Sequence, residues 1–72
     1  MNRFNHNKLR LSKWTAVVPV NKQKHFIVTE LILDELEKEV VGCVLEAVIN
    51  KQQFKIDWRK LKDSDSWIQG WK

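Results

Sequence analysis

Alternation of apolar and polar side chains predicts β-strands in several parts of the chain. Within residues 12–20, Trp14, Ala16 and Val18 share one face, and residues 24–33 form a second run rich in β-branched and aromatic side chains. Such residues fit the pleated, partly buried surface of a sheet. We therefore predict that these two runs form a β-hairpin, with Trp14 as an anchor in the core.

The residues between these runs, Asn21-Lys-Gln-Lys24, are polar and basic. They predict a short turn that carries Lys22 and Lys24 beside His25. Pro19 has no backbone N–H to donate, so it is expected to end the first strand or to lie at a sheet edge. The hairpin is thus predicted to have a cationic tip.

Residues 29–49 allow two interpretations. Apolar positions in this stretch fit one face of a helix, but Gly42 in its middle would cost about 1 kcal/mol and several β-branched residues also disfavour a helix. The same stretch fits a strand, a loop at the acidic residues 34–39, and a second strand over 40–49, in which Cys43, Leu45 and Ala47 share a face. We favour strand–loop–strand.

The cleanest alternation follows, where Phe54, Ile56 and Trp58 are separated by charged residues. This pattern predicts a half-exposed antiparallel strand through Arg59. Its apolar face is expected to place these three aromatic and aliphatic side chains among the most buried, together with Trp14.

The remaining segments are predicted to be irregular. Residues 1–11 form a basic lead-in, and a short helical turn is possible near 63–68. The tail, 63–72, is expected to pack back through its tryptophans. The whole chain, 1–72, is predicted to be one mainly β domain, an antiparallel sheet of four to five strands that is coiled or closed as an SH3-like barrel.

Composition supports a small core built from aromatic residues. The chain has 72 residues, four Trp, three Phe and a single cysteine. A chain of this length buries about 60% of its unfolded surface, so aromatic side chains must supply much of the core. One cysteine excludes an internal disulfide and favours a reducing compartment. The first eight residues lack the apolar core of a signal peptide, and no run is long enough to span a membrane. A cytoplasmic location is expected.

Charge is distributed unevenly along the chain. The formal charge is +6 over residues 1–25, −5 over 26–50 and +3 over 51–72, which gives a net charge of +4. This asymmetry predicts a basic face and an acidic face, and it points to partners rather than to a particular fold.

The residue pattern does not indicate catalysis or metal binding. His6, His25 and Cys43 are far apart in the sequence and form no metal-ligand motif. His6 is expected to be exposed and Cys43 to act as a small buried hydrophobe. We predict neither a metal nor another cofactor, and no enzyme activity.

Basic residues interleaved with aromatic ones favour a binding function. Such a pattern is typical of small β proteins that bind single-stranded nucleic acid, so RNA or a ribonucleoprotein is the first predicted partner. The residues predicted to contact it are Arg10, Lys13, Lys22, Lys24, His25, Lys55 and Arg59. The alternative is a protein-interaction module that uses Trp67, Trp71 and the acidic connector 34–39.

Several short motifs resemble one protein family. Their order in the chain is Ser-Lys-Trp-Thr-Ala16, Lys-His-Phe26, Leu-Glu-Ala-Val48, Trp-Arg-Lys-Leu-Lys-Asp63 and Trp-Ile-Gln-Gly-Trp71. Together they are similar to the small tryptophan-rich bacterial family, over roughly residues 7–72. The resemblance implies no activity and no catalytic residue, because that family has no established function. It supports the strand interpretation of residues 40–49.

Overall fold

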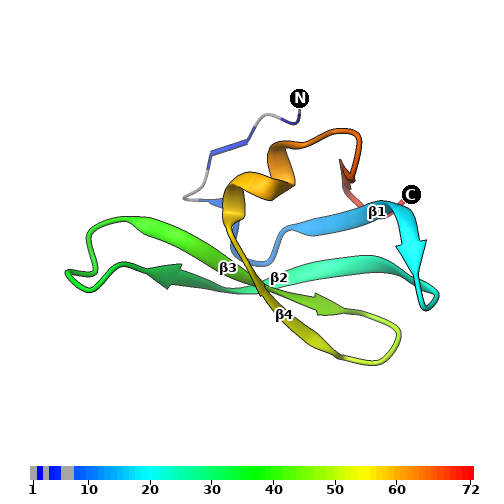
Figure 1. Ribbon diagram of the computed structural model, residues 1–72, viewed down its shortest axis with the longest axis horizontal. Coiled ribbons are helices and arrows are strands. Elements are labelled where there is room, and N and C mark those ends of the chain that lie inside the picture. The colour runs from blue at the N-terminus through cyan, green and yellow to red at the C-terminus, as the bar shows by residue number, and fades with distance from the viewer. Residues whose placement is uncertain (1, 3, 6–7) are drawn as a thin grey trace.

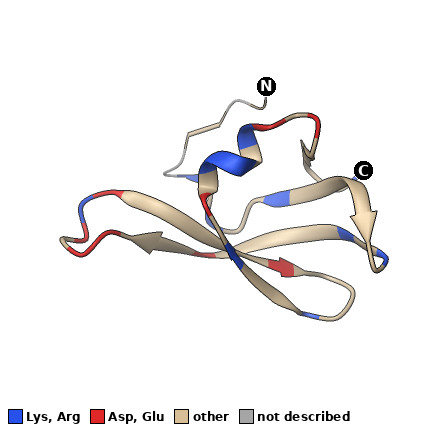
Figure 2. Ribbon diagram, in the orientation of Figure 1, with Lys and Arg blue, Asp and Glu red and all other residues tan. Residues whose placement is uncertain are grey.

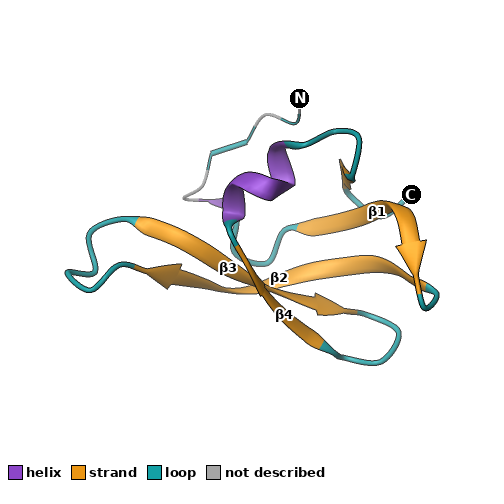
Figure 3. Cartoon of the chain, in the orientation of Figure 1, coloured by secondary structure: helices purple, strands orange, loops and turns teal. Residues whose placement is uncertain are grey.

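The computed structural model describes residues 2, 4–5 and 8–72, and in this part of the chain it contains five β-strands and a short 3₁₀ helix (Figures 1 and 3). The elements are β1 (Lys13–Val20), β2 (Gln23–Leu33), β3 (Val40–Ala47), β4 (Gln53–Ile56), the helix η2 (Trp58–Lys62) and β5 (Trp67–Gln69). His6, which was predicted to be exposed, lies outside the described residues.

β1 and β2 form the predicted hairpin. Trp14 pairs with Phe26 and Val20 with Gln23, so the turn is only Asn21 and Lys22. Both turn residues have a positive φ, 55° for Asn21 and 64° for Lys22. Two consecutive positive φ angles are what a two-residue type I′ turn requires, and its twist matches that of the strands. The turn is therefore shorter than the four residues predicted, and Lys24 belongs to β2.

β2 and β3 confirm the strand–loop–strand interpretation of residues 29–49. Leu31 pairs with Cys43 and Leu33 with Val40 across a turn at the acidic connector. Gly42 is buried in β3, where an added Cβ would lie 2.8 Å from the backbone oxygen of Ile56 in β4. Gly42 therefore permits the close approach of β4, which explains a glycine within this strand.

β4 is shorter than the strand predicted from the alternation. It ends at Ile56, and Trp58 and Arg59 belong to η2. The reason is local: Asp57 caps the helix, since its Oδ1 accepts a hydrogen bond of 2.9 Å from the backbone N–H of Arg59. The helical turn thus lies at 58–62 rather than near 63–68. Residues 64–66 form a turn, in which Asp63 accepts from the backbone N–H of Asp65.

The five strands form one antiparallel sheet in the order β4-β3-β2-β1-β5. β5 joins the edge of β1, where Trp67 pairs with Ala16 and Gln69 with Trp14. The predicted antiparallel sheet is confirmed, and it is open: β4 and β5 lie at its two ends. Among the described residues no pairing closes it into an SH3-like barrel.

The core lies on one face of this sheet, beneath η2 and the N-terminal segment. Its buried members are Leu9, Trp14, Phe26, Val28, Cys43, Leu45, Ala47 and Leu61. Trp14 is only 1% exposed, as predicted. Phe54, Ile56 and Trp58 are half-buried instead, so the prediction that they rank among the most buried side chains was wrong. Two of them border an open cavity, and Trp58 lies in η2 rather than in the sheet.

η2 and the N-terminal segment hold each other in place over the core. The side-chain amide of Asn2 donates to the backbone oxygen of Leu61 at 2.9 Å, and its backbone N–H donates to Lys62 at the same distance. The ring of Phe4 packs in T-shaped arrangements with Trp14 and Trp58, at centroid distances of 5.4 and 6.0 Å. These contacts leave the opposite end of the core face, beyond Trp67, without such a cover.

Candidate binding pocket

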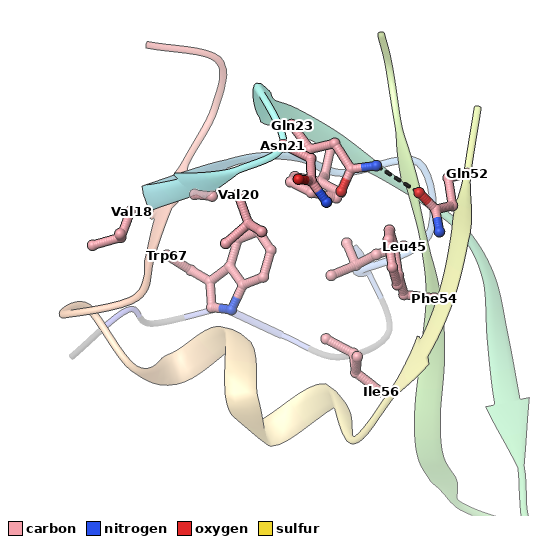
Figure 4. A pocket seen from close by; sticks show the side chains of 11 residues that line it. Val18, Val20, Asn21, Gln23, Leu45, Gln52, Phe54, Ile56 and Trp67 are labelled. Carbon is pink, nitrogen blue, oxygen red and sulfur yellow. Dashed lines mark hydrogen bonds between the residues drawn. The ribbon is translucent and has the colours of Figure 1, made fainter. Parts of the chain in front are cut away.

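An apolar pocket of about 360 Å³ lies at the uncovered end of the core face, open to solvent (Figure 4). Its lining is Ala16, Val18, Val20, Asn21, Gln23, Phe26, Leu45, Gln52, Phe54, Ile56 and Trp67. These residues come from all five strands and from the turns before β2 and β4. Concave, mostly apolar sites with a few polar groups are the usual form of a binding site.

A bend in β1 creates one wall of the pocket. The pairing of β1 with β2 shifts register between Thr15 and Val20, and Pro19 lies within this irregular part. The bend turns the apolar side chains after Ala16 out of the core. Val18 is 75% exposed and Val20 64% exposed, although alternation placed Val18 on the buried face with Trp14. Two valines held in solvent beside a pocket form an apolar rim.

A pair of glutamines forms the polar part of the pocket. Gln23, at the start of β2, is only 6% exposed, and its Nε2 donates to Oε1 of Gln52 at 2.7 Å. This bond ties the β1–β2 turn to the turn that precedes β4, as Figure 4 shows. The pair satisfies two polar groups in an apolar surrounding and fixes the distance between the two turns.

Trp67 forms the wall opposite these glutamines (Figure 4). The strand β5 positions it through pairing with Ala16, and its ring packs in a T-shaped arrangement with Phe26 at a centroid distance of 5.2 Å. The side-chain amide of Asn2 donates to the backbone oxygen of Trp67. An aromatic ring held by backbone pairing loses little freedom on binding, so Trp67 is suited to receive an apolar group.

Trp71 lies elsewhere. Its Nε1 donates to the backbone oxygen of Phe26 at 3.0 Å, while Nζ of Lys13 lies 4.8 Å from its ring centroid and the His25 ring 5.9 Å away. Lys13 and His25 belong to the sheet face opposite Trp14 and Phe26, because neighbouring strand residues point to opposite faces. Trp67 and Trp71, which were predicted to act together, therefore lie on different faces.

The residues predicted to bind nucleic acid are dispersed. Lys13 and His25 meet at Trp71, whereas Lys22 and Lys24 are exposed at the hairpin end. Lys55 is exposed on β4, and Arg10 is exposed before β1. Arg59 was expected to share a strand face with Lys55. It lies on η2 instead, 3.6 Å from Asp57 and 5.5 Å from the Trp58 ring.

Three exposed lysines lie next to pocket-lining residues in the sequence. Lys22 and Lys24 flank the lining residue Gln23, and Lys51 precedes Gln52 in the second turn (Figure 2). Acidic residues are missing from the segments 13–29 and 47–56, which supply most of the lining. Glu46 lies nearby in β3, where its carboxylate accepts from the Gln53 amide at 3.3 Å. The two turns that contribute to the pocket therefore carry positive charge.

Cys43 is a buried core residue. Burial, and to a lesser degree the charge of Asp57, raises the pKa of its thiol to about 11. The Cys43 thiol is thus protonated at neutral pH, so almost none of it is present as the thiolate that a nucleophilic cysteine requires. Among residues 2, 4–5 and 8–72, His, Cys, Asp and Glu form no group of three that could hold a metal ion.

Some pocket residues had no signal in the alternation. Val20, Gln23 and Gln52 were assigned no role, because each lies at or beside a turn rather than within a regular strand. The available signal was the sequence Val-Val-Pro-Val20, in which a proline interrupts the strand and no polar residue separates the three valines.

Comparison with known proteins gives a family but no relative of assigned activity. A family model described as Tryptophan-rich protein (DUF2389) matches residues 12–72. No curated protein and no solved structure matches the chain. The described residues contain no helix that is long and apolar enough to cross a membrane.

Proposed function

Because the chain belongs to this tryptophan-rich family of unknown function, as its motifs predicted, we propose a function from its own surface: it is a non-catalytic module that binds an apolar side chain of a partner protein. The observation that carries the proposal is the open apolar pocket between Val20, Phe54 and Trp67. We place the module in the cytoplasm, since its one cysteine is a free thiol.

Three properties of the pocket support a protein partner. Its volume of about 360 Å³ lies at the lower end of the range for binding sites, which suits one or two side chains. The partner would cover the exposed valines at the rim of the pocket. Burial of this apolar area would contribute about 25 cal/mol per Å² to the free energy of binding. The rigid aromatic wall at Trp67 resembles the aromatic anchors that dominate protein interfaces.

Site-specific photo-crosslinking tests this proposal. A photoreactive phenylalanine analogue is placed at Val20 on the rim, or at Val17 as a matched control in the same strand, outside the pocket. We expect protein adducts in cells from position 20 and few from position 17, unchanged by nuclease treatment. Equal adduct yields at both positions, or adducts only to RNA, would contradict it.

A second candidate, RNA binding, is favoured by the cluster of Lys13, His25 and Trp71. Basic residues beside exposed aromatic rings are common in sites that bind single-stranded nucleic acid. Trp71 is partly exposed, and Lys13 already occupies one face of its ring. If RNA binds here, Lys13→Glu lowers affinity and reduces the slope of log affinity against log salt by about 0.7, while Lys38→Glu in the acidic connector changes neither. Absence of RNA binding at low salt would eliminate this candidate.

A further inference from the structure

The acidic connector 34–39 is an ordered turn with an apolar tip. Oδ1 of Asp34 accepts hydrogen bonds from the backbone N–H groups of Leu36 and Lys38, at 3.1 and 2.9 Å. The backbone N–H of Asp34 donates to Glu39 at 2.9 Å and so closes the turn. Leu36 is 72% exposed at this tip, although no backbone requirement calls for leucine there.

Charge on this turn is opposite to charge on the two turns beside the pocket. The turn holds Asp34, Glu35, Glu37 and Glu39 against Lys38, a formal charge of −3. The two turns beside the pocket hold Lys22, Lys24 and Lys51, a formal charge of +3. An exposed apolar side chain between acidic residues thus matches an apolar pocket whose neighbouring turns carry lysines, and such charge complementarity favours association and fixes orientation.

The two surfaces lie at opposite ends of the molecule. Figure 2 shows the acidic turn at one end of the long axis and the two turns that border the pocket at the other. The chain extends 37 Å along this axis, so the turn cannot enter the pocket of its own chain. Contact between them must therefore join different copies of the chain, and a head-to-tail arrangement of the copies makes it a heterologous contact.

We propose that the pocket binds a second copy of this chain, with Leu36 of one copy inserted between the valine rim and Trp67 of the next. The inference rests on the proposed function, because it requires the pocket to accept an apolar side chain. Exposed Leu33 and Val41 at the base of the turn add apolar area to the contact. A pair joined by one such contact retains one free turn and one free pocket, so assembly continues into an open chain or closes into a ring.

Two single variants separate the two halves of this contact. Leu36→Asp removes the inserted side chain and leaves the pocket intact, while Val20→Asp places a negative charge on the rim and leaves the turn intact. Both positions are exposed, so both variants are expected to fold as the parent does. Circular dichroism and thermal melting check this, and Val17→Asp is the matched control.

Sedimentation velocity of the full chain at low ionic strength measures the association. We expect the parent and Val17→Asp to form species larger than a dimer as concentration rises, with an apparent Kd that increases at least tenfold at 0.5 M salt. Each of the other variants alone should be monomeric. Their 1:1 mixture should stop at a heterodimer, because only one functional turn and one functional pocket remain.

A monomeric parent at about 1 mM protein, or a mixture of the two variants that stays monomeric, would overturn self-association. If crosslinking at position 20 still captures another protein in that case, the proposed function stands and only the identity of the occupant is wrong. If both experiments are negative, the pocket has no protein-binding role. Association of the Leu36→Asp variant as strong as that of the parent would show that another surface is responsible.

Discussion

Replacing Leu61 with alanine tests how η2 is attached to the sheet. Leu61 is fully buried and is the one buried residue of η2. Leu→Ala changes in cores cost about 2–5 kcal/mol, since they lose transfer free energy and leave a cavity. A chain of this length is expected to have a free energy of unfolding of about 4–11 kcal/mol, so the variant loses a large share of it.

Thermal and urea unfolding, followed by circular dichroism, measure this loss. For a domain of this size each kcal/mol shifts the Tm by about 4–8 °C, so a loss of 3 kcal/mol lowers it by about 12–24 °C. Lys60→Ala is the control, because Lys60 is exposed on the same helix and should change stability by less than about 0.5 kcal/mol.

The same experiment decides between η2 and a longer strand. If β4 continued through residue 61 with a period of two, Leu61 would point to the face of Lys55, opposite Phe54 and Ile56. Leu61→Ala would then cost little. A loss below about 1 kcal/mol, similar to that of Lys60→Ala, would refute the packing described for η2.

Three further changes test close contacts within the sheet. Gly42→Ala should lower the free energy of unfolding, measured in urea, by about 1–2 kcal/mol. The new Cβ would lie 2.8 Å from Ile56 O, and this overpacking outweighs the gain in strand propensity. Unchanged stability would contradict the close packing of β4 against Gly42. Trp58→Phe should cost about 1–3 kcal/mol, since it removes the 2.8 Å hydrogen bond from Nε1 to Val40 O; a melting temperature equal to that of the parent would show that this bond is dispensable. The pKa of Cys43, raised from 9.0 to about 11, predicts slow native labelling by a thiol reagent at pH 8. It also predicts stability that is present below pH 9 and lost as pH rises to 11, because the unfolded thiol ionises first; a Cys43→Ala variant with the same pH profile would contradict the assignment.

The regular strands were predictable because their signals are local. Trp14 is buried as the alternation predicted, and Cys43, Leu45 and Ala47, which were predicted to share a face of the second strand, are all buried. The end of β4 was not predictable from alternation, because Trp58 continues the period while Asp57 breaks it through a side-chain hydrogen bond to the backbone. The capping hydrogen bond of Asp57 competes with continuation of β4, and the alternation of apolar residues gives no sign of it.

The pocket depends on tertiary structure, which explains why the sequence did not reveal it. Its rim arises from the bend that turns Val18 and Val20 outward, a consequence of irregular pairing rather than of composition. Trp67 was predicted as a contact residue and lies in the pocket. Trp71 was assigned to the same surface but lies on the other face, because Gly70 has a φ of 83° and turns the chain after β5.

The place of β5 in the sheet has a consequence for local unfolding. β2, β3 and β4 pair only with strands next to them in sequence, whereas β5 pairs with the distant β1, and the Thr15 hydroxyl donates to Gly70 O across 55 positions. A three-residue edge strand with so distant a partner is expected to detach before the rest of the sheet opens. Since Trp67 leaves with it, detachment removes one wall of the pocket. Any ligand that fills the pocket therefore slows hydrogen exchange of the β5 amides by a factor set by its concentration relative to Kd, while the amides at the β2–β3 centre respond only to global unfolding.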